Sequence, residues 1–322
     1  MNNACFTYSQ QLMGTTVSLQ LLTENLQAVA AVFNTIEALE ALLTVNREHS
    51  EVMNINHAAG KHPVTVSDLV FDLIMQAKQA SLLPNSIFNL AIGPLVKLWK
   101  IGFSGHTVPD SQSISEKLAL TDPRLIVLNK QNNSVYLPKT GMEIDLGAIA
   151  KGYIADIIKL VLVQYDIHHA IINCGGNVLT IGSSPLSPNK YWKVGLKKPF
   201  ASATSLLGII RVQDKSVVTS GIYERYFIQN NHLYHHIINP ATGFPLDNEL
   251  ESITIISENS LTGDIFSTIL YGLGIKKGRE ELNKRTSIGA IFVTKDKQII
   301  LQNDQHFQFQ LLDKNYQLHK SV

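Results

Sequence analysis

The amino-acid sequence predicts a mixed α+β fold in one well-buried domain, and three observations support this. Segments with helical apolar spacing and segments rich in β-branched and aromatic residues both occur, without the regular alternation of a doubly wound sheet. Apolar residues make up 45% of the 322 residues and charged residues 16%, whereas soluble domains average about 25% charged. No repeat of fixed period is visible. We therefore expect one well-buried domain over residues 1–322, with two closely packed lobes and no flexible linker.

The first half of the chain is expected to be mainly helical. Alternating apolar residues predict a strand over 13–22, and apolar residues at helical spacing predict a helix over 26–43. Ser67 is an apt N-cap for a second helix, which Pro84 would stop. The Gly, Ser, Pro and Asp content of 102–123 predicts connecting structure.

The second half is expected to be richer in strands. Residues 125–137 predict a hairpin turning at 131–133, and the segment from Asp145 predicts a loop that opens into a long helix. One further helix is expected over 264–273. The β-branched and aromatic segments that predict strands are 169–181, 192–197, 206–212, 226–237, 252–257 and 288–301.

Charge and cysteine content exclude several classes of partner. The 27 basic and 26 acidic residues nearly balance, which argues against nucleic acid. Cys5 and Cys174 cannot build a disulfide framework, and the first residues lack a basic start with an apolar stretch, so we expect a cytoplasmic protein. No run approaches the roughly 20 apolar residues needed to span a bilayer, and no membrane insertion is expected.

Two polar clusters at helices have spacings that suit phosphate chemistry. Asp145 precedes a helix start with Lys151 in its first turn, so this segment either holds a phosphate or consists of a capping Asp145 and a solvated Lys151. Asp264 and Thr268, four residues apart, share one helical face. They either clamp a hard cation that also touches substrate phosphates, or form a cap and an ordinary helical threonine.

Two further clusters lie in segments expected to be strands. Neighbouring strand residues point to opposite faces, so only one of His235 and His236 can serve a given site. The paired glycines of 173–177 either allow close approach of a ligand or form a tight turn.

Taken together and in order, these clusters resemble the ApbE-type family of FAD:protein FMN transferases. The resemblance covers about nine-tenths of the chain and is specific because seven segments occur in the family's order. They read SEVMNIN, FNLAIGPLVKLW, DLGAIAKGYIAD, INCGGN, VTSGIYERYF, HHIINPATGFPL and GDIFSTILYGLG.

The resemblance implies a flavin site between two lobes, with Mg²⁺ at the diphosphate of FAD. The cation would be held by the backbone carbonyl of Ala148 and the side chains of Asp264 and Thr268. Ser220, Glu224 and Arg225 match the family's TSG-YER signature, and His236 matches its histidine near the diphosphate. Either Asp264 or His236 would act as general base. The residues implied to line the FAD pocket are Met13, Asn46, Ile87, Phe88, Asn89, Asp145, Lys151 and Ile238.

The implied partners are FAD and an acceptor redox protein with a Thr or Ser flavinylation motif. Two alternative functions stay open, namely an FAD pyrophosphatase that uses the same site and gives FMN and AMP, and a flavin-binding protein without chemistry. Some positions depart from the commonest family pattern. Asn46 replaces a frequent tyrosine, Asn89 and Asn239 replace frequent aspartates, and Ala241 replaces a frequent arginine, which leaves the details of flavin contact open.

Overall fold

The protein is described by a computed structural model that covers residues 5–202 and 204–319. Its chain forms two compact units. Unit 1 comprises Met1–Glu40, Ile149–Gly221 and Glu249–Val322, and unit 2 comprises Ala41–Ala148 and Ile222–Asn248. The chain thus passes from one unit to the other four times.

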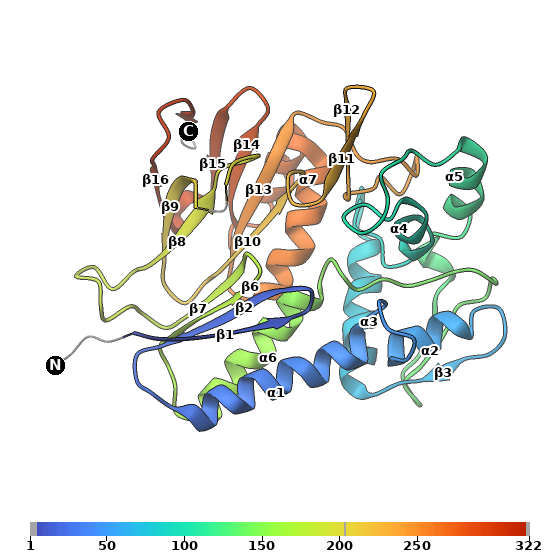
Figure 1. The fold of residues 1–322 in the computed structure, drawn as a ribbon, viewed down its shortest axis with the longest axis horizontal. Coiled ribbons are helices and arrows are strands. Elements are labelled where there is room, and N and C mark those ends of the chain that lie inside the picture. The colour runs from blue at the N-terminus through green and yellow to red at the C-terminus, as the bar shows by residue number, and fades with distance from the viewer. Residues whose placement is uncertain (1–4, 203, 320–322) are drawn as a thin grey trace. The chain divides into compact units, whose positions relative to one another are not determined.

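Unit 1 is built on a nine-stranded mixed sheet (Figure 1). All neighbours pair antiparallel except β15 and β17, which are parallel. The strands, in spatial order, are β1 (Phe6–Leu12), β2 (Thr15–Leu21), β6 (Ala170–Cys174), β7 (Asn177–Ile181), β10 (Ser216–Gly221), β13 (Leu250–Ser257), β14 (Gly289–Thr294), β15 (Gln298–Gln302) and β17 (Gln317–His319).

Different layers cover the two faces of this sheet. A three-stranded sheet of β16 (Gln308–Leu311), β9 (Leu206–Val212) and β8 (Trp192–Lys197) packs on one face. The apolar cluster between the sheets includes Val178, Val217, Ile210 and Ile256. On the other face, helix α7 (Ser260–Asn283, orange in Figure 1) contacts β7, β10 and β13, and helix α6 (Ala150–Gln164) packs on α7.

Helix α1 (Leu26–Leu43) confirms the predicted apolar face. Its buried side chains are Ala28 and the apolar residues at helical spacing, Val29, Val32, Phe33, Ile36, Leu39 and Leu43. Length and composition alone would let α1 cross a membrane, a test that core helices and signal sequences pass equally. The one-sided burial is that of a helix packed against protein.

Unit 2 is mainly helical and has two small sheets. Trp99 lies in its core, where the indole nitrogen donates to the carbonyl of Gly243 at 2.8 Å and the ring stacks on Tyr234. The helices are α2 (Glu51–His57), α3 (Asp68–Ser81), α4 (Gly93–Trp99), α5 (Ser111–Leu118) and the short η1 (Pro123–Leu125). The strands are β3 (Val64–Thr65), β5 (Ser134–Tyr136) and β4 (Val127–Asn129), and the hairpin of β11 (Tyr226–Gln229) and β12 (His232–His235).

The structure corrects three predicted elements. Residues 102–123 are not only connecting structure, because Asp110 caps α5 by accepting from the Ser113 N–H at 2.8 Å. Met13 does not start a strand, because Met13 and Gly14 have positive φ angles and form the turn between β1 and β2. The helix expected over 264–273 begins earlier, at Ser260, and continues past a kink at Gly274.

Candidate functional site

Asp264 lies in unit 1, on the side of α7 that faces α6 and the sheet. Its side chain is only 5% exposed. One carboxylate oxygen accepts from the backbone N–H of Gly152 on α6 at 2.6 Å, and the other accepts from the Asn177 amide on β7 at 3.0 Å. Two structural elements therefore hold this carboxylate in a fixed orientation.

Asp264 does not cap its own helix, α7. The cap of α7 is Asn259, whose side chain accepts from the Thr262 N–H at 2.8 Å. Asp156 of α6 supplements the cap, because its two oxygens accept from the N–H groups of Ser260 and Leu261 at 2.7 and 2.9 Å. Since these two side chains serve the helix start, the capping interpretation of Asp264 is wrong.

Burial makes the ionised form of Asp264 unfavourable. Desolvation raises the pKa of Asp264 to about 6, against the attraction of Lys151 and the hydrogen bonds from Gly152 and Asn177. Lys151 lies half-buried in the first turn of α6, as the sequence predicts. A buried carboxylate opposed by one cation is an arrangement typical of functional sites.

Thr268 lies one turn after Asp264 on α7. Its hydroxyl donates to the Asp264 carbonyl at 3.3 Å. The neighbouring Ser267 bonds the same carbonyl at 3.0 Å and accepts from the Ser220 hydroxyl of β10 at 2.8 Å. Ser220 thus contacts the helix that bears Asp264 and Thr268, and all three belong to unit 1.

The Asp264 carboxylate and the Thr268 hydroxyl suit Mg²⁺, which prefers oxygen ligands and keeps several waters. A carboxylate with one bond to each oxygen retains lone pairs for a cation. Within residues 5–202 and 204–319, no group of three or more His, Cys, Asp or Glu side chains is arranged to hold a metal. The third predicted ligand, Ala148, belongs to unit 2.

Met13 is the remaining predicted flavin contact in unit 1, after Lys151 and Ser220. It lies at the tip of the β1–β2 hairpin with φ of 53°, and its N–H donates to the Glu40 carboxylate at 2.9 Å. The side chain is half-buried. Both central residues of this turn, Met13 and Gly14, have positive φ angles, as tight hairpin turns require. The bond to Glu40 holds the tip in place.

Asp145 lies beside the predicted flavin contacts at 87–89, within unit 2. Its N–H donates to the Leu90 carbonyl at 3.0 Å, and its carboxylate accepts from the Gly147 N–H at 2.7 Å. Desolvation raises the pKa of Asp145, against the Gly147 hydrogen bond and the attraction of Arg225 and Lys97. Asp145 does not cap α6, whose N-cap position is Ile149.

The side chains of residues 87–89 are largely engaged within the protein. Phe88 is 3% exposed and belongs to the core, whereas Ile87 is half-buried. The Asn89 amide donates to the Thr121 carbonyl and accepts from the Ala91 N–H, both at 2.8 Å. The turn predicted at 87–89 lies instead at residues 90–91, and Asn89 holds its start.

Arg225 and His236 lie side by side at the β11–β12 hairpin. The His236 ring nitrogen Nδ1 lies 3.2 Å from the Arg225 carbonyl, and the Arg225 guanidinium lies over the ring of Phe103. Desolvation lowers the pKa of Arg225, against the attraction of Asp145 and Glu224. The expected strand ends at His235, so His236 lies just beyond β12; His235 is buried and bonds the Leu246 carbonyl at 2.7 Å, whereas His236 is half-buried.

Two predicted unit 2 contacts differ in burial. Ile238 is 7% exposed and packs in the cluster around Trp99, so its side chain contributes to the core. Asn46 is exposed in the loop before α2. The predicted flavin contacts remain predictions. Like the predicted metal ligands, some of them belong to unit 1 and others to unit 2.

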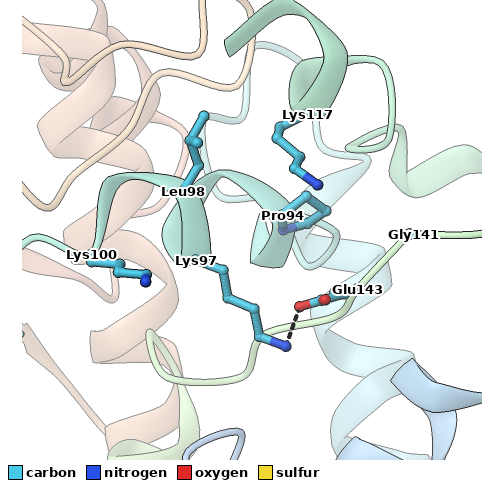
Figure 2. Close-up of a pocket in the computed structure, with 7 residues that line it drawn as sticks. All are labelled: Pro94, Lys97, Leu98, Lys100, Lys117, Gly141 and Glu143. Carbon is cyan, nitrogen blue, oxygen red and sulfur yellow. Dashed lines mark ion pairs between the residues drawn. The ribbon is translucent and has the colours of Figure 1, made fainter. Parts of the chain in front are cut away.

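Sequence reasoning missed a small basic pocket in unit 2 with a volume of about 370 Å³ (Figure 2). Lys97 of α4 points across it and forms an ion pair with Glu143 at 2.6 Å. Lys100 and Lys117 complete its basic side. Glu143 lies two residues before Asp145, and Lys97 and Glu143 both act electrostatically on that carboxyl.

Comparisons with known proteins agree with these observations. A family model described as the ApbE family matches residues 13–292. The chain is 52% identical to an FAD:protein FMN transferase of Klebsiella pneumoniae, with 98% of each chain covered. It is 34% identical to one of Treponema pallidum, over 84% of this chain and 78% of that protein.

A solved structure supports the same relationship. The crystal structure of the ApbE protein of Thermotoga maritima matches with a TM-score of 0.81 at 28% identity, covering 91% of this chain and 95% of that one. The mixed α+β class expected from the sequence is thus confirmed. Together, the family model, the identity across nearly the whole chain and the shared fold show that the chain belongs to the ApbE family.

Proposed function

We propose that this chain is an FAD:protein FMN transferase that requires Mg²⁺ and attaches FMN to a Thr or Ser hydroxyl of an acceptor protein. The observation that carries the proposal is the buried Asp264 carboxylate with the Thr268 hydroxyl one turn along α7. The 52% identity to the Klebsiella enzyme over 98% of the chain supports the activity.

The reaction exchanges one P–O bond for another. The acceptor oxygen bonds to the phosphorus on the FMN side of the FAD diphosphate, and the bond from that phosphorus to the bridging oxygen breaks. AMP leaves with the bridging oxygen, and the hydroxyl proton passes to a base. Bound Mg²⁺ would neutralise charge on the diphosphate and on the leaving AMP.

The protein's own residues would supply orientation, charge and a base. Asp264 and Thr268 would hold the cation in unit 1, and the Ala148 carbonyl is the third ligand we propose. Lys151 and Arg225 would balance negative charge that develops on phosphate oxygens. The base is His236 or Asp264. If Nδ1 of His236 carries the proton that it donates to the Arg225 carbonyl, Nε2 is the unprotonated nitrogen of the ring.

The direct test is FMN transfer to protein. Proteins of the source cells are incubated with FAD, Mg²⁺ and the enzyme, and an acceptor is identified by its flavin fluorescence and the added mass of FMN. Asp264→Asn should lower the rate by roughly 100- to 1000-fold, because it removes the anionic ligand of the cation that would stabilise charge on the reacting phosphates. Parent-like transfer by this variant would refute the cation assignment.

Asp156→Asn is the matched control, because Asp156 is a second carboxylate between α6 and α7 that serves the start of α7. It should lower stability and retain transfer. Release of FMN and AMP in the absence of acceptor would instead favour an FAD pyrophosphatase, and FAD binding without turnover would favour a flavin-binding protein. We also propose that the enzyme and its acceptor are cytoplasmic, which fractionation of the flavinylated proteins would test.

A further inference from the structure

Asn177 links Asp264 to the sheet through a chain of buried side chains in unit 1. The Ser216 hydroxyl donates to the Ser260 hydroxyl at 3.0 Å, and Ser260 donates to the Asn177 amide oxygen at 2.6 Å. The Asn177 amide nitrogen then donates to the Asp264 carboxylate at 3.0 Å. Each of these four side chains is at most 5% exposed.

This chain of hydrogen bonds fixes which way the Asn177 amide points. With its oxygen taken by Ser260, the amide presents N–H to Asp264. The flipped amide would place its oxygen against a carboxylate oxygen, and two acceptors repel each other in a buried site. Asp264 is therefore oriented by a partner that is itself oriented.

No capping or packing requirement accounts for this arrangement. The start of α7 is already served by Asn259 and Asp156, and the β6–β7 turn is held by Asn173, which accepts from the Gly176 N–H at 2.8 Å. Packing alone would be met by an apolar side chain at position 177, which would leave the buried Ser260 hydroxyl and an Asp264 oxygen without these partners. The Asn177 amide thus acts on the carboxylate of Asp264.

We propose that Asn177 is a positioning residue, which holds the Asp264 carboxylate in the orientation that binds the cation and leaves lone pairs directed at it. The inference rests on the proposed function, in which Asp264 is a cation ligand. Partners that orient metal ligands typically change metal affinity about 10- to 100-fold when removed. Asn177 is predicted to act in this way without touching the cation.

The test measures metal dependence apart from catalysis. FAD binding is followed by quenching of flavin fluorescence while Mg²⁺ is varied, and FMN transfer is measured at saturating Mg²⁺. Asn177→Ala should raise the Mg²⁺ concentration for half-maximal FAD binding by about tenfold or more, and saturating Mg²⁺ should restore most of the transfer rate. A structural role alone would leave the Mg²⁺ requirement unchanged.

Thr180→Val is the matched control, because Thr180 is buried on the same strand, donates to the Lys215 carbonyl at 2.8 Å and has no bond to Asp264. It should lower the melting temperature without shifting the Mg²⁺ requirement. If Asn177→Ala does not fold, Ser260→Ala takes its place, since it frees the amide to turn while keeping Asn177. An unchanged Mg²⁺ requirement in the folded variant would overturn the proposal.

Asp264→Asn separates this inference from the proposed function. If Asp264→Asn shifts the Mg²⁺ requirement and Asn177→Ala does not, the positioning role fails and the cation site stands. If neither the parent nor Asp264→Asn shows any Mg²⁺ dependence of FAD binding, the cation assignment itself fails and the positioning role falls with it.

Discussion

Gly152→Ala should damage the Asp264 site by simple crowding. A β-carbon at residue 152 would lie 2.5 Å from the Ser260 carbonyl oxygen and 2.7 Å from a carboxylate oxygen of Asp264, roughly an ångström inside ordinary contact distance. The Ser260 oxygen is backbone, so α6 and α7 must separate. Separation also breaks the 2.6 Å bond from the Gly152 N–H to Asp264.

The expected loss of stability can be assembled from these effects. Overpacking costs about 1–3 kcal/mol, and loss of a hydrogen bond to a charged group costs about 1.5–3 kcal/mol. Alanine recovers about 1 kcal/mol over glycine in a helix. We expect Gly152→Ala to lower the free energy of unfolding, measured by urea titration, by about 2–4 kcal/mol. It should also raise the Mg²⁺ concentration needed for FAD binding.

Gly278→Ala provides the control on the same helical layer. A β-carbon there would meet the ring of Phe292 at 3.2 and 3.4 Å, which small movements relieve. Its stability should stay within about 1 kcal/mol of the parent, because helix propensity offsets the mild crowding. If Gly152→Ala were as stable as Gly278→Ala and kept the parent's Mg²⁺ requirement, the contact between α6 and α7 would not support the site as argued.

Three further outcomes follow from the same structure. Thr268→Val should raise the Mg²⁺ concentration for half-maximal transfer by about tenfold, and an unchanged value would remove Thr268 from the ligand set. Burial raises the pKa of Glu251 to about 7, above its ordinary value, so the folded state binds the extra proton and stability falls as pH rises from about 4.5 to 7. Urea midpoints of Glu251→Gln should fall less over this range, with the raised pKa of Asp264 still contributing, and a profile parallel to the parent's would refute the assignment. Glu249→Ala should lower stability by about 1 kcal/mol, because its carboxylate accepts from the Ile275 N–H at 2.7 Å beyond the kink at Gly274, and thermal unfolding measures this.

Elements with a local signal were predictable from the sequence. Helix α1 has the predicted bounds because its apolar spacing runs unbroken for five turns, and strands β8 and β9 also have theirs. Helices α2, α4 and α5 were missed, since each is short. The only strong signals of α2 and α5 were their capping residues, Ser50 for α2 and Asp110 for α5.

The candidate site shows the same division between local and distant information. Asp264 and Thr268 could be paired from sequence because four residues make one helical turn. Gly152 and Asn177 contact Asp264 across 112 and 87 residues of sequence. No spacing rule connects such distant positions, so the INCGGN and AKGY segments indicated a site without indicating that both support one carboxylate.

The contrast between Asp156 and Asp264 shows what kind of site unit 1 contains. Both carboxylates lie between α6 and α7, and desolvation raises the pKa of both. Asp156 accepts from two N–H groups at the start of α7, which an α-helix requires from some partner. Asp264 lies inside α7, and one of its oxygens accepts from the Gly152 N–H, which has no acceptor within the first turn of α6. Its other oxygen accepts from the Asn177 amide, which no helix end requires. A cation beside the carboxylate would offset the remaining cost of burying its charge.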